Sequence, residues 1–429
     1  MSRSKKLYIL LGVLVVACIA TLAVTQIAEH KEQIKNSGEP ILELSGDSVQ
    51  ALSWEHKGET LAFHRDETWL YDEDEKFPVS EDKINGLLEQ FQPLSAAFVI
   101  EGVEDYGQYG LDNPVCTIHL TTEEQSYEIK LGDFSKMDSQ RYASIGDGNV
   151  YLVQNDPLDQ FDAVLSDMIA HDEMPDFDQV TSIQFSGAQD YAASYEEDSS
   201  NTYCAEDVYF TRRGEKSLPL DTERVGSYLR KIANLNPTNY VTYNVTDEEL
   251  NTYGLDTPEL TVTVEYTPKD EETAEVFILH VSRDPEEIKK PSDEDDGEDE
   301  TVTAYLRVDQ SQIIYQISSD QYKDLMAASY DDLRHLEIFT ADFADVRQID
   351  ISLEGDSYTL TSEEKGKERA WSCQEKELEI DDLKATLEAL RADEFTSEKP
   401  SQKEEIGLTV HLDNEHFPTV SIRLYRHDG

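Results

Sequence analysis

The chain opens with a long apolar run, and beyond it apolar and polar residues alternate. The run from residue 7 to 28 carries no charge and follows Arg3, Lys5 and Lys6. Its length matches the roughly 20 residues that a helix needs to cross a bilayer. Basic residues before the run and an acidic bulk after it favour a cytoplasmic N-terminus. The pattern predicts a basic tail over 1–6, a transmembrane anchor over 7–28 and an extracytoplasmic remainder.

Two other interpretations of this apolar run stay open. A cleaved secretory signal has a shorter apolar core and a small-residue cleavage site, and no Ala-x-Ala sequence follows this run. Residues 15–18, Val-Val-Ala-Cys, partly match the lipobox of a lipoprotein signal, in which Cys18 carries a lipid. Apolar residues continue past Cys18 as far as Ile27, so length and flanking charge favour the uncleaved anchor.

Beyond the anchor, three stretches repeat one pattern of strand and helix signals. Each opens with an alternating phrase typical of a half-buried strand, at residues 49–54, 180–185 and 346–351. Each continues with a second strand phrase and a helix that has one apolar stripe. A period this long indicates tandem domains. The stripes are Ile84, Leu87, Leu88 and Phe91; Val225, Leu229 and Ile232; and Leu383, Leu387 and Leu390.

The predicted helices begin at residues that favour helix N-termini. Ser80, Asp221 and Asp381 stand directly before the three stripes, and their side chains can accept a hydrogen bond from a free backbone N–H. We therefore expect each of the three to be an N-cap.

A turn motif after the helix is the sharpest similarity between the first two repeats. Glycine in it supplies a backbone angle that other residues resist, and proline favours extended geometry in the residue before it. We interpret the motif as a structural turn that directs the next strand, in preference to a ligand site. Its residues are Tyr109, Gly110, Leu111, Asp112 and Pro114 in repeat one, and Tyr253, Gly254, Leu255, Asp256 and Pro258 in repeat two.

Repeat three departs from this pattern. Residues 406–408, Ile-Gly-Leu, stand in place of the turn, and no signals for a last hairpin follow the strand at 420–425. We expect either an incompletely covered sheet edge, which is an association hazard, or a chain that is a fragment of a longer one.

These signals predict an α+β fold of tandem modules, each an antiparallel sheet with one packed helix, preceded by a single transmembrane helix. A chain of 429 residues also exceeds one ordinary core. The expected divisions are a stalk at 29–45, repeat one at 46–170, repeat two at 175–330 with an acidic loop at 283–303, and a partial repeat three at 340–429.

The order of motifs resembles the bacterial family of domains of unknown function numbered 4340. The resemblance rests on Trp69 through the Pro78 helix start, on both turn motifs, and on residues 142–143 with 150–153. It covers most of repeats one and two but only the first half of repeat three. It implies an anchored envelope protein, in some cases encoded beside ABC transporter components, and it carries over no catalytic residues.

Composition excludes some classes of function. The formal charge of −55 opposes binding to nucleic acid. The sequence contains no nucleophile elbow, no phosphate-binding glycine loop and no His-Glu-x-x-His helix. Cys116, Cys204 and Cys373 are too widely spaced for a Cys-x-x-Cys motif. We therefore predict no catalytic residues, no cofactor and no metal site.

The acidic run at 292–300 suggests an EF-hand loop, but Thr303 stands where a bidentate glutamate belongs. We interpret the run as a flexible loop. The sequence thus predicts a non-catalytic, membrane-anchored binding or scaffold protein. The family resemblance implies that it belongs to the bacterial envelope, with an envelope protein such as an ABC transporter component as partner. Two alternatives stay open: an envelope hydrolase that uses acidic residues, and a weak calcium-binding surface protein.

Overall fold

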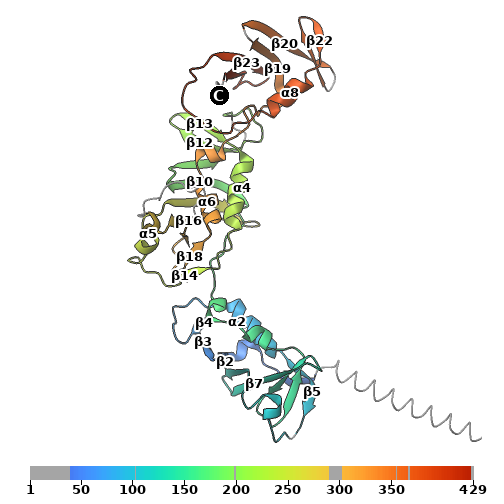
Figure 1. Ribbon diagram of the computed structural model, residues 1–429, viewed down its shortest axis with the longest axis vertical. Helices are drawn as coiled ribbons and strands as arrows, with labels where there is room; N and C mark the ends of the chain where they lie inside the picture. Colours follow the sequence, from blue (N-terminus) through green and yellow to red (C-terminus); the bar gives the residue numbers. More distant parts are fainter. Residues whose placement is uncertain are drawn as a thin grey trace, which may run out of the picture. The chain divides into compact units, whose positions relative to one another are not determined.

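The computed structural model describes residues 39–426 apart from 102, 198–199, 289–301, 354 and 366–367. The chain divides into two compact units, one ending at His171 and the other beginning at Asp172, and each is described by itself (Figure 1). The predicted tail, anchor and Cys18 lie outside the described residues, as does most of the predicted acidic loop. Among the described residues, no helix has both the length and the apolar character for a membrane span.

The first unit is built on a nine-stranded antiparallel sheet with the order β1-β5-β9-β8-β7-β6-β2-β3-β4. Helix α2 packs on it through Ile84, Leu87 and Leu88, as the predicted stripe requires, and the Ser80 hydroxyl accepts a hydrogen bond from the Lys83 N–H, which confirms that cap. The strands are β1 Glu39–Leu42, β2 Val49–His56, β3 Glu59–Arg65, β4 Trp69–Tyr71, β5 Leu94–Ile100, β6 Cys116–Thr122, β7 Ser126–Ser135, β8 Gln140–Ser144 and β9 Val150–Val153. The helices are η1 Gly46–Ser48, α2 Glu81–Leu88, η2 Glu89–Phe91, η3 Gly107–Tyr109, α3 Leu158–Phe161 and η4 Leu165–Met168.

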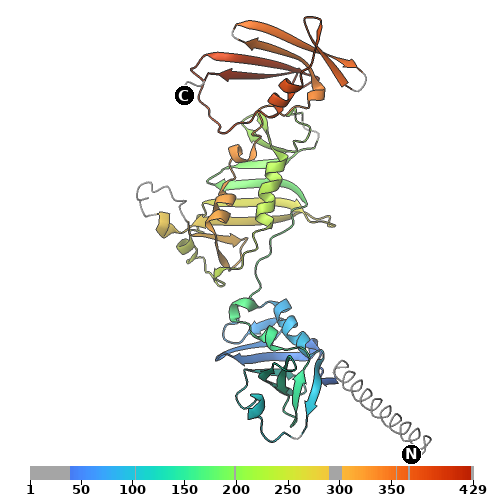
Figure 2. The same cartoon turned by 45° about the vertical axis from the view of Figure 1, so that its right-hand side comes forward.

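The second unit contains two sheets, of which the first has nine antiparallel strands in the order β13-β12-β11-β10-β15-β16-β17-β18-β14. Helix α4 lies across one face of this sheet (Figure 2), and the Tyr228 hydroxyl donates to the Leu325 carbonyl of α6 at 2.9 Å. The strands are β10 Gln179–Gly187, β11 Tyr191–Tyr195, β12 Tyr209–Arg213, β13 Lys216–Leu220, β14 Tyr240–Thr242, β15 Leu260–Thr267, β16 Glu275–Arg283, β17 Ala304–Val308 and β18 Ile314–Ile317. The helices are α4 Thr222–Ala233, η5 Leu250–Tyr253, α5 Pro285–Ile288, α6 Ser319–Met326 and α7 Tyr330–Leu333.

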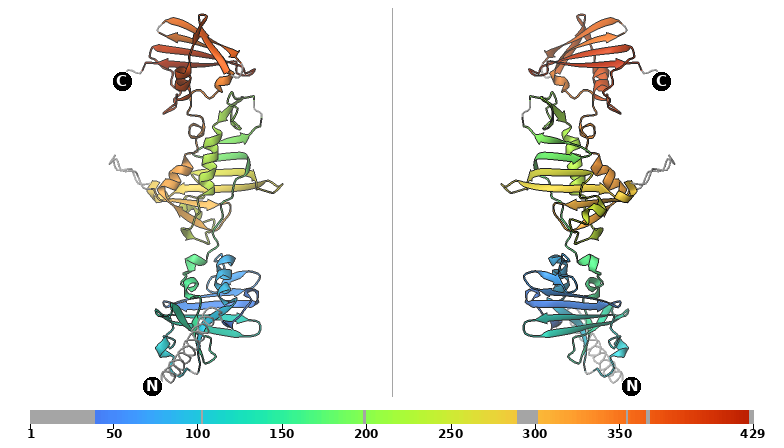
Figure 3. Two further views of the ribbon diagram at one scale, coloured as in Figure 1. Left: turned by 90° about the vertical axis from the view of Figure 1, so that its right-hand side faces the viewer. Right: turned by 90° about the vertical axis from the view of Figure 1, so that its left-hand side faces the viewer.

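The other sheet of the second unit has six antiparallel strands in the order β22-β21-β20-β19-β23-β24. Leu387 of α8 shares a core with Trp371 and Val410 of the sheet, against which the helix lies (Figure 3). The elements are η6 Phe343–Asp345, β19 Val346–Leu353, β20 Asp356–Lys365, β21 Glu368–Cys373, β22 Lys376–Leu378, α8 Asp381–Glu388, β23 Glu404–Leu412 and β24 Thr419–Tyr425.

The three sheets share one irregularity, which supports their origin as copies of one module. The register shifts between Val49 and Ala51 in β2, between Val180 and Ser182 in β10, and between Val346 and Gln348 in β19. Each shift leaves one extra residue on the opening strand, which is a β-bulge. The structure has the predicted α+β class with antiparallel sheets, and it contains more strands than helices.

Several expected boundaries are corrected by the structure. The stalk predicted at 29–45 is too long, because β1 pairs with β5 and the buried Leu44 donates its N–H to the Phe91 carbonyl at 2.9 Å. Helix α7 continues repeat two past the predicted end at 330, and its Leu333 carbonyl accepts the Asp221 N–H at 2.9 Å. Short elements of this kind have too few residues to show a period.

Two predictions for repeat three are wrong in detail. Ile380, and not Asp381, stands at the N-cap of α8 and makes no side-chain cap, because the helix begins at Asp381 itself. Residues 406–408 form no turn, since they lie inside β23 and pair with both β19 and β24. In the described part of this sheet, β24 has β23 as its one neighbouring strand, so β24 is an edge strand.

Candidate functional site

The two turn motifs singled out by the sequence have the same structure. Gly110 ends η3 and Gly254 ends η5, with left-handed φ angles of 70° and 69°. In both turns the leucine is buried, the aspartate exposed and the proline half-buried; these are Leu111, Asp112 and Pro114, and Leu255, Asp256 and Pro258. The motif tyrosines pack on a strand tyrosine, Tyr109 with Tyr142 at 4.9 Å and Tyr253 with Tyr305 at 5.1 Å between ring centroids. These contacts support a structural role.

A different part of the second unit gathers groups with chemical capacity. A cleft of about 700 Å³ lies beside the loop between β11 and β12, strand β13 and the segment after α7. Its lining is mixed, with Asp207 and His335 together with the aromatic rings of Tyr330, Phe395 and Phe417. Such a cleft is large enough to admit a small ligand.

The loop before β12 is organised by Thr202. Its hydroxyl donates to Asp207 Oδ2 at 2.6 Å and accepts the Cys204 N–H at 3.0 Å. A backbone turn, in which the Asp207 N–H donates to the Cys204 carbonyl at 3.3 Å, places the two side chains near each other. Cys204 is buried, and 1% of the Asp207 side chain is exposed. The loop therefore holds a thiol and a carboxylate in fixed positions that are almost completely shielded from solvent.

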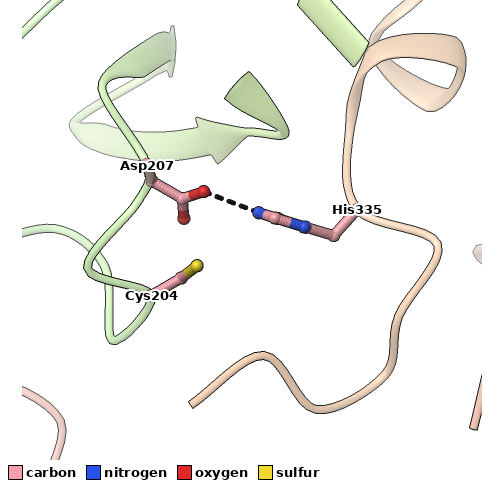
Figure 4. A group of neighbouring side chains, drawn as sticks. All are labelled: Cys204, Asp207 and His335. Carbon is pink, nitrogen blue, oxygen red and sulfur yellow. Dashed lines mark hydrogen bonds and ion pairs between the residues drawn. The ribbon is translucent and has the colours of Figure 1, made fainter. Parts of the chain in front are cut away.

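His335 reaches the same place from the segment that follows α7. Its Nε2 lies 2.6 Å from Asp207 Oδ1, and Figure 4 shows His335 approaching Cys204 and Asp207 from a second segment. On the other side of the ring, Nδ1 lies 3.6 Å from Asp221 Oδ2 and 4.0 Å from Glu337 Oε2. The imidazole ring thus lies between Asp207 at Nε2 and the carboxylates of Asp221 and Glu337 at Nδ1.

Burial and neighbouring charge shift the pKa values of this cluster. Burial raises the pKa of the Cys204 thiol to about 11, and the nearby Asp207 and Glu206 charges add to that effect. Burial opposes protonation of His335, but its hydrogen bond with Asp207 and the charges of Asp207, Asp221 and Glu337 outweigh this and raise its pKa. A protonated thiol is a poor nucleophile. The raised pKa of the Cys204 thiol thus does not favour an activated cysteine–histidine pair.

The same groups have the spacing of metal ligands. The ligand atoms of Cys204, Asp207 and His335 lie within 4.8 Å of one another, and so do those of Asp221, His335 and Glu337. In the described ranges these are the two groups of that kind. Sulfur, nitrogen and oxygen donors together suit a borderline divalent metal such as zinc.

This cluster differs from the sequence-based prediction of no metal site. Asp207 and His335 are 128 positions apart, and His335 falls between the predicted repeats two and three. The available signal was the Cys204-x-x-Asp207 spacing, in which a turn can bring two ligands together. A search limited to Cys-x-x-Cys spacing misses that pattern.

The pKa values of several described carboxylates bear on acid–base chemistry. Such an enzyme raises the pKa of one carboxyl group by burial or by a like charge. Five described carboxylates instead have a lowered pKa, and they are Asp147, Asp162, Glu249, Glu259 and Asp350.

The repeated antiparallel sheets define the class as a tandem-module α+β protein. The chain belongs to the family described as a domain of unknown function, DUF4340, whose model matches residues 69–206 and 211–410 in two tandem copies. No curated protein and no solved structure matches the chain.

Proposed function

We propose that the protein is a non-catalytic binding or scaffold protein of the bacterial envelope. In this proposal residues 7–28 form its membrane anchor, the repeats lie on the extracytoplasmic side, and a component of an ABC transporter is the candidate partner. The observation that carries the proposal is the repetition of one module, with the same bulge at the start of each sheet. Repeated modules suit binding because they offer several similar surfaces on one chain.

The apolar run at residues 7–28 supports the membrane anchor in this proposal. An anchor confines the repeats to a thin layer beside other membrane proteins and raises their effective concentration there. The uncharged run follows three basic residues, in the arrangement of a signal anchor. The large negative charge on the remainder agrees with a solvated surface that does not adhere to anionic lipid.

The proposal predicts that partner capture depends on the anchor. The full chain and a variant with residues 7–28 replaced by a cleaved secretory signal should be expressed at equal levels, crosslinked in cells and captured. The full chain should retain a transporter component, and the anchorless variant should retain far less, because its local concentration at the membrane is lost. Capture of the same proteins at the same yield by both forms would contradict the role of the anchor. Recovery of nothing above background by either would contradict the scaffold.

A further inference from the structure

We propose that Cys204, Asp207 and His335 form a binding site for a borderline divalent transition metal of the zinc type. The three side chains supply one sulfur, one oxygen and one nitrogen atom within 4.8 Å of one another (Figure 4). This donor set suits zinc or cobalt, whereas calcium and magnesium prefer sites made of oxygen alone. The site is independent of the proposed scaffold function.

The neighbours of the three ligand side chains hold them in position before a metal binds. Thr202 holds Asp207 through Oδ2 and leaves Oδ1 directed at His335. On the far side of the imidazole, Asp221 Oδ2 lies 3.6 Å from Nδ1. A carboxylate at the outer nitrogen of a metal-bound histidine fixes the ring and strengthens it as a ligand.

Asp221 is itself held in place by helix α4. Its Oδ1 accepts the N–H groups of Glu223 and Arg224 at 2.9 and 3.2 Å, so that Oδ2 remains to face His335. The N-cap predicted from the sequence therefore also places a carboxylate beside the imidazole.

Little rearrangement is needed for a metal to enter. His335 Nε2 and Asp207 Oδ1 lie 2.6 Å apart, and two ligand atoms on a tetrahedral zinc are separated by roughly 3.3 Å. The two atoms must therefore part by roughly 0.7 Å when both bind one metal. Asp207 and His335 both line the 700 Å³ cleft, so a fourth ligand, such as water, can be supplied from it.

A metal here would connect two segments that are distant in sequence. Cys204 and Asp207 belong to the loop before β12, whereas His335 lies on the segment that leads to the third sheet. That segment continues to Glu337, which pairs with Arg391 at 3.1 Å just after α8. Metal binding should therefore order the connection between the two sheets of the second unit.

Cobalt binding to the full-length chain in detergent, under reducing conditions, provides the test. A large excess of magnesium and calcium should be present, because the acidic surface would otherwise bind cobalt weakly through oxygen atoms. We expect one equivalent of Co²⁺ per chain with the near-ultraviolet absorption of a cobalt–thiolate bond, displaced by Zn²⁺. Zn²⁺ should also raise the unfolding temperature. Absence of the thiolate absorption in the wild-type chain would overturn the proposal.

Matched variants assign the ligands. Cys204→Ser and His335→Gln should abolish the cobalt–thiolate absorption and the zinc-dependent rise in unfolding temperature. Cys373→Ser and His411→Gln are the controls, since His411 also pairs with an aspartate, Asp350, at 2.7 Å. Both controls should bind like the wild type. Binding that survives in the Cys204 or His335 variant, or that is lost in either control, would overturn the assignment.

A milder variant guards against loss of folding in the ligand variants. Thr202→Val keeps the shape of the side chain but removes the hydroxyl that holds Asp207. The cobalt–thiolate absorption should persist, with affinity reduced by about 10- to 100-fold. Unchanged affinity would contradict a site that is held by Thr202.

Discussion

At the scale of single residues, glycine in the repeated turn is required by backbone geometry and by close neighbours. A Cβ atom on Gly110 would lie 2.6 Å from Asp133 Cγ and 2.9 Å from the Asp133 backbone nitrogen. A Cβ atom on Gly254 would lie 2.7 Å from Ser282 Oγ. Both glycines also have positive φ, which L-residues with side chains rarely adopt.

Gly110→Ala should therefore destabilise the first unit. The left-handed backbone alone costs about 1–3 kcal/mol, and the contact with the Asp133 backbone adds to this. Gly146→Ala is the matched control, because Gly146 has a φ of +80° with nothing within 4 Å of its Cβ position. Urea unfolding in a Trp371→Phe background, where Trp54 and Trp69 report on the first unit, measures both. Equal losses in the two variants would show that the contact has no effect.

The same residues show what the sequence could and could not predict. Gly110 and Pro114 favour particular backbone angles, so the sequence alone predicts the turn. His335 carries no local signal of its role, because its partners Cys204 and Asp207 are brought to it by the fold. The cluster depends on tertiary structure and so could not be deduced from local pattern.

At the scale of elements, the N-cap predicted at Ser80 is confirmed and the one predicted at Asp381 is wrong. Ser80 caps α2, whereas Asp381 is the first residue of α8 and acts there through its charge. Ser80→Ala should cost about 0.5–2 kcal/mol, and Asp381→Ala about 0.3–1 kcal/mol, because only the first removes a capping hydrogen bond. Hydrogen exchange of the α2 and α8 amides checks this. A larger loss for Asp381→Ala would contradict the observed boundary.

A carboxylate directly after the second turn motif makes stability depend on pH. Glu259 accepts hydrogen bonds from the Arg283 side chain at 2.6 Å, the Arg283 backbone N–H at 2.9 Å and the Tyr322 hydroxyl at 2.9 Å. Burial raises the pKa of Glu259, but these bonds outweigh it and lower the pKa overall. Its contribution to the free energy of unfolding is thus present above about pH 4.3 and is lost as the pH falls through the folded pKa.

Glu259→Gln should lower the free energy of unfolding of the second unit by about 1–3 kcal/mol at neutral pH. The difference from the wild type should shrink as the pH falls through the lowered pKa of Glu259 in the folded protein, where its carboxylate becomes protonated. The exposed Glu248→Gln is the control and should show little difference at either pH. Denaturant unfolding across this pH range measures the effect. A difference that is constant with pH would show that Glu259 acts without its charge.

The elements that the sequence predicts correctly are long and have a clear apolar period. The opening strands and the stripes of α2 and α4 were recognised because several apolar residues share one period. Strand β13 was missed, since it has five residues and contains Pro219. Proline is tolerated there because β13 is the edge strand of its sheet and one side of it needs no partner.

At the scale of the whole molecule, three antiparallel sheets share a common strand order, and the third has fewer strands in the described chain. Strands β20, β19, β23 and β24 correspond to β11, β10, β15 and β16, but β17, β18 and β14 have no counterpart in the described third sheet. The repetition was visible in the sequence because each copy keeps its strand and helix signals in the same order.

The central claim is that these modules are held on the outer side of a membrane by residues 7–28. Protease added to intact cells, with a tag on each terminus, tests it most directly. We predict that the C-terminal tag is digested without lysis, and that a short N-terminal fragment stays protected and remains in the membrane fraction after a high-salt wash. Resistance of the C-terminal tag until the cells are lysed, or release of the intact chain by salt, would contradict the claim.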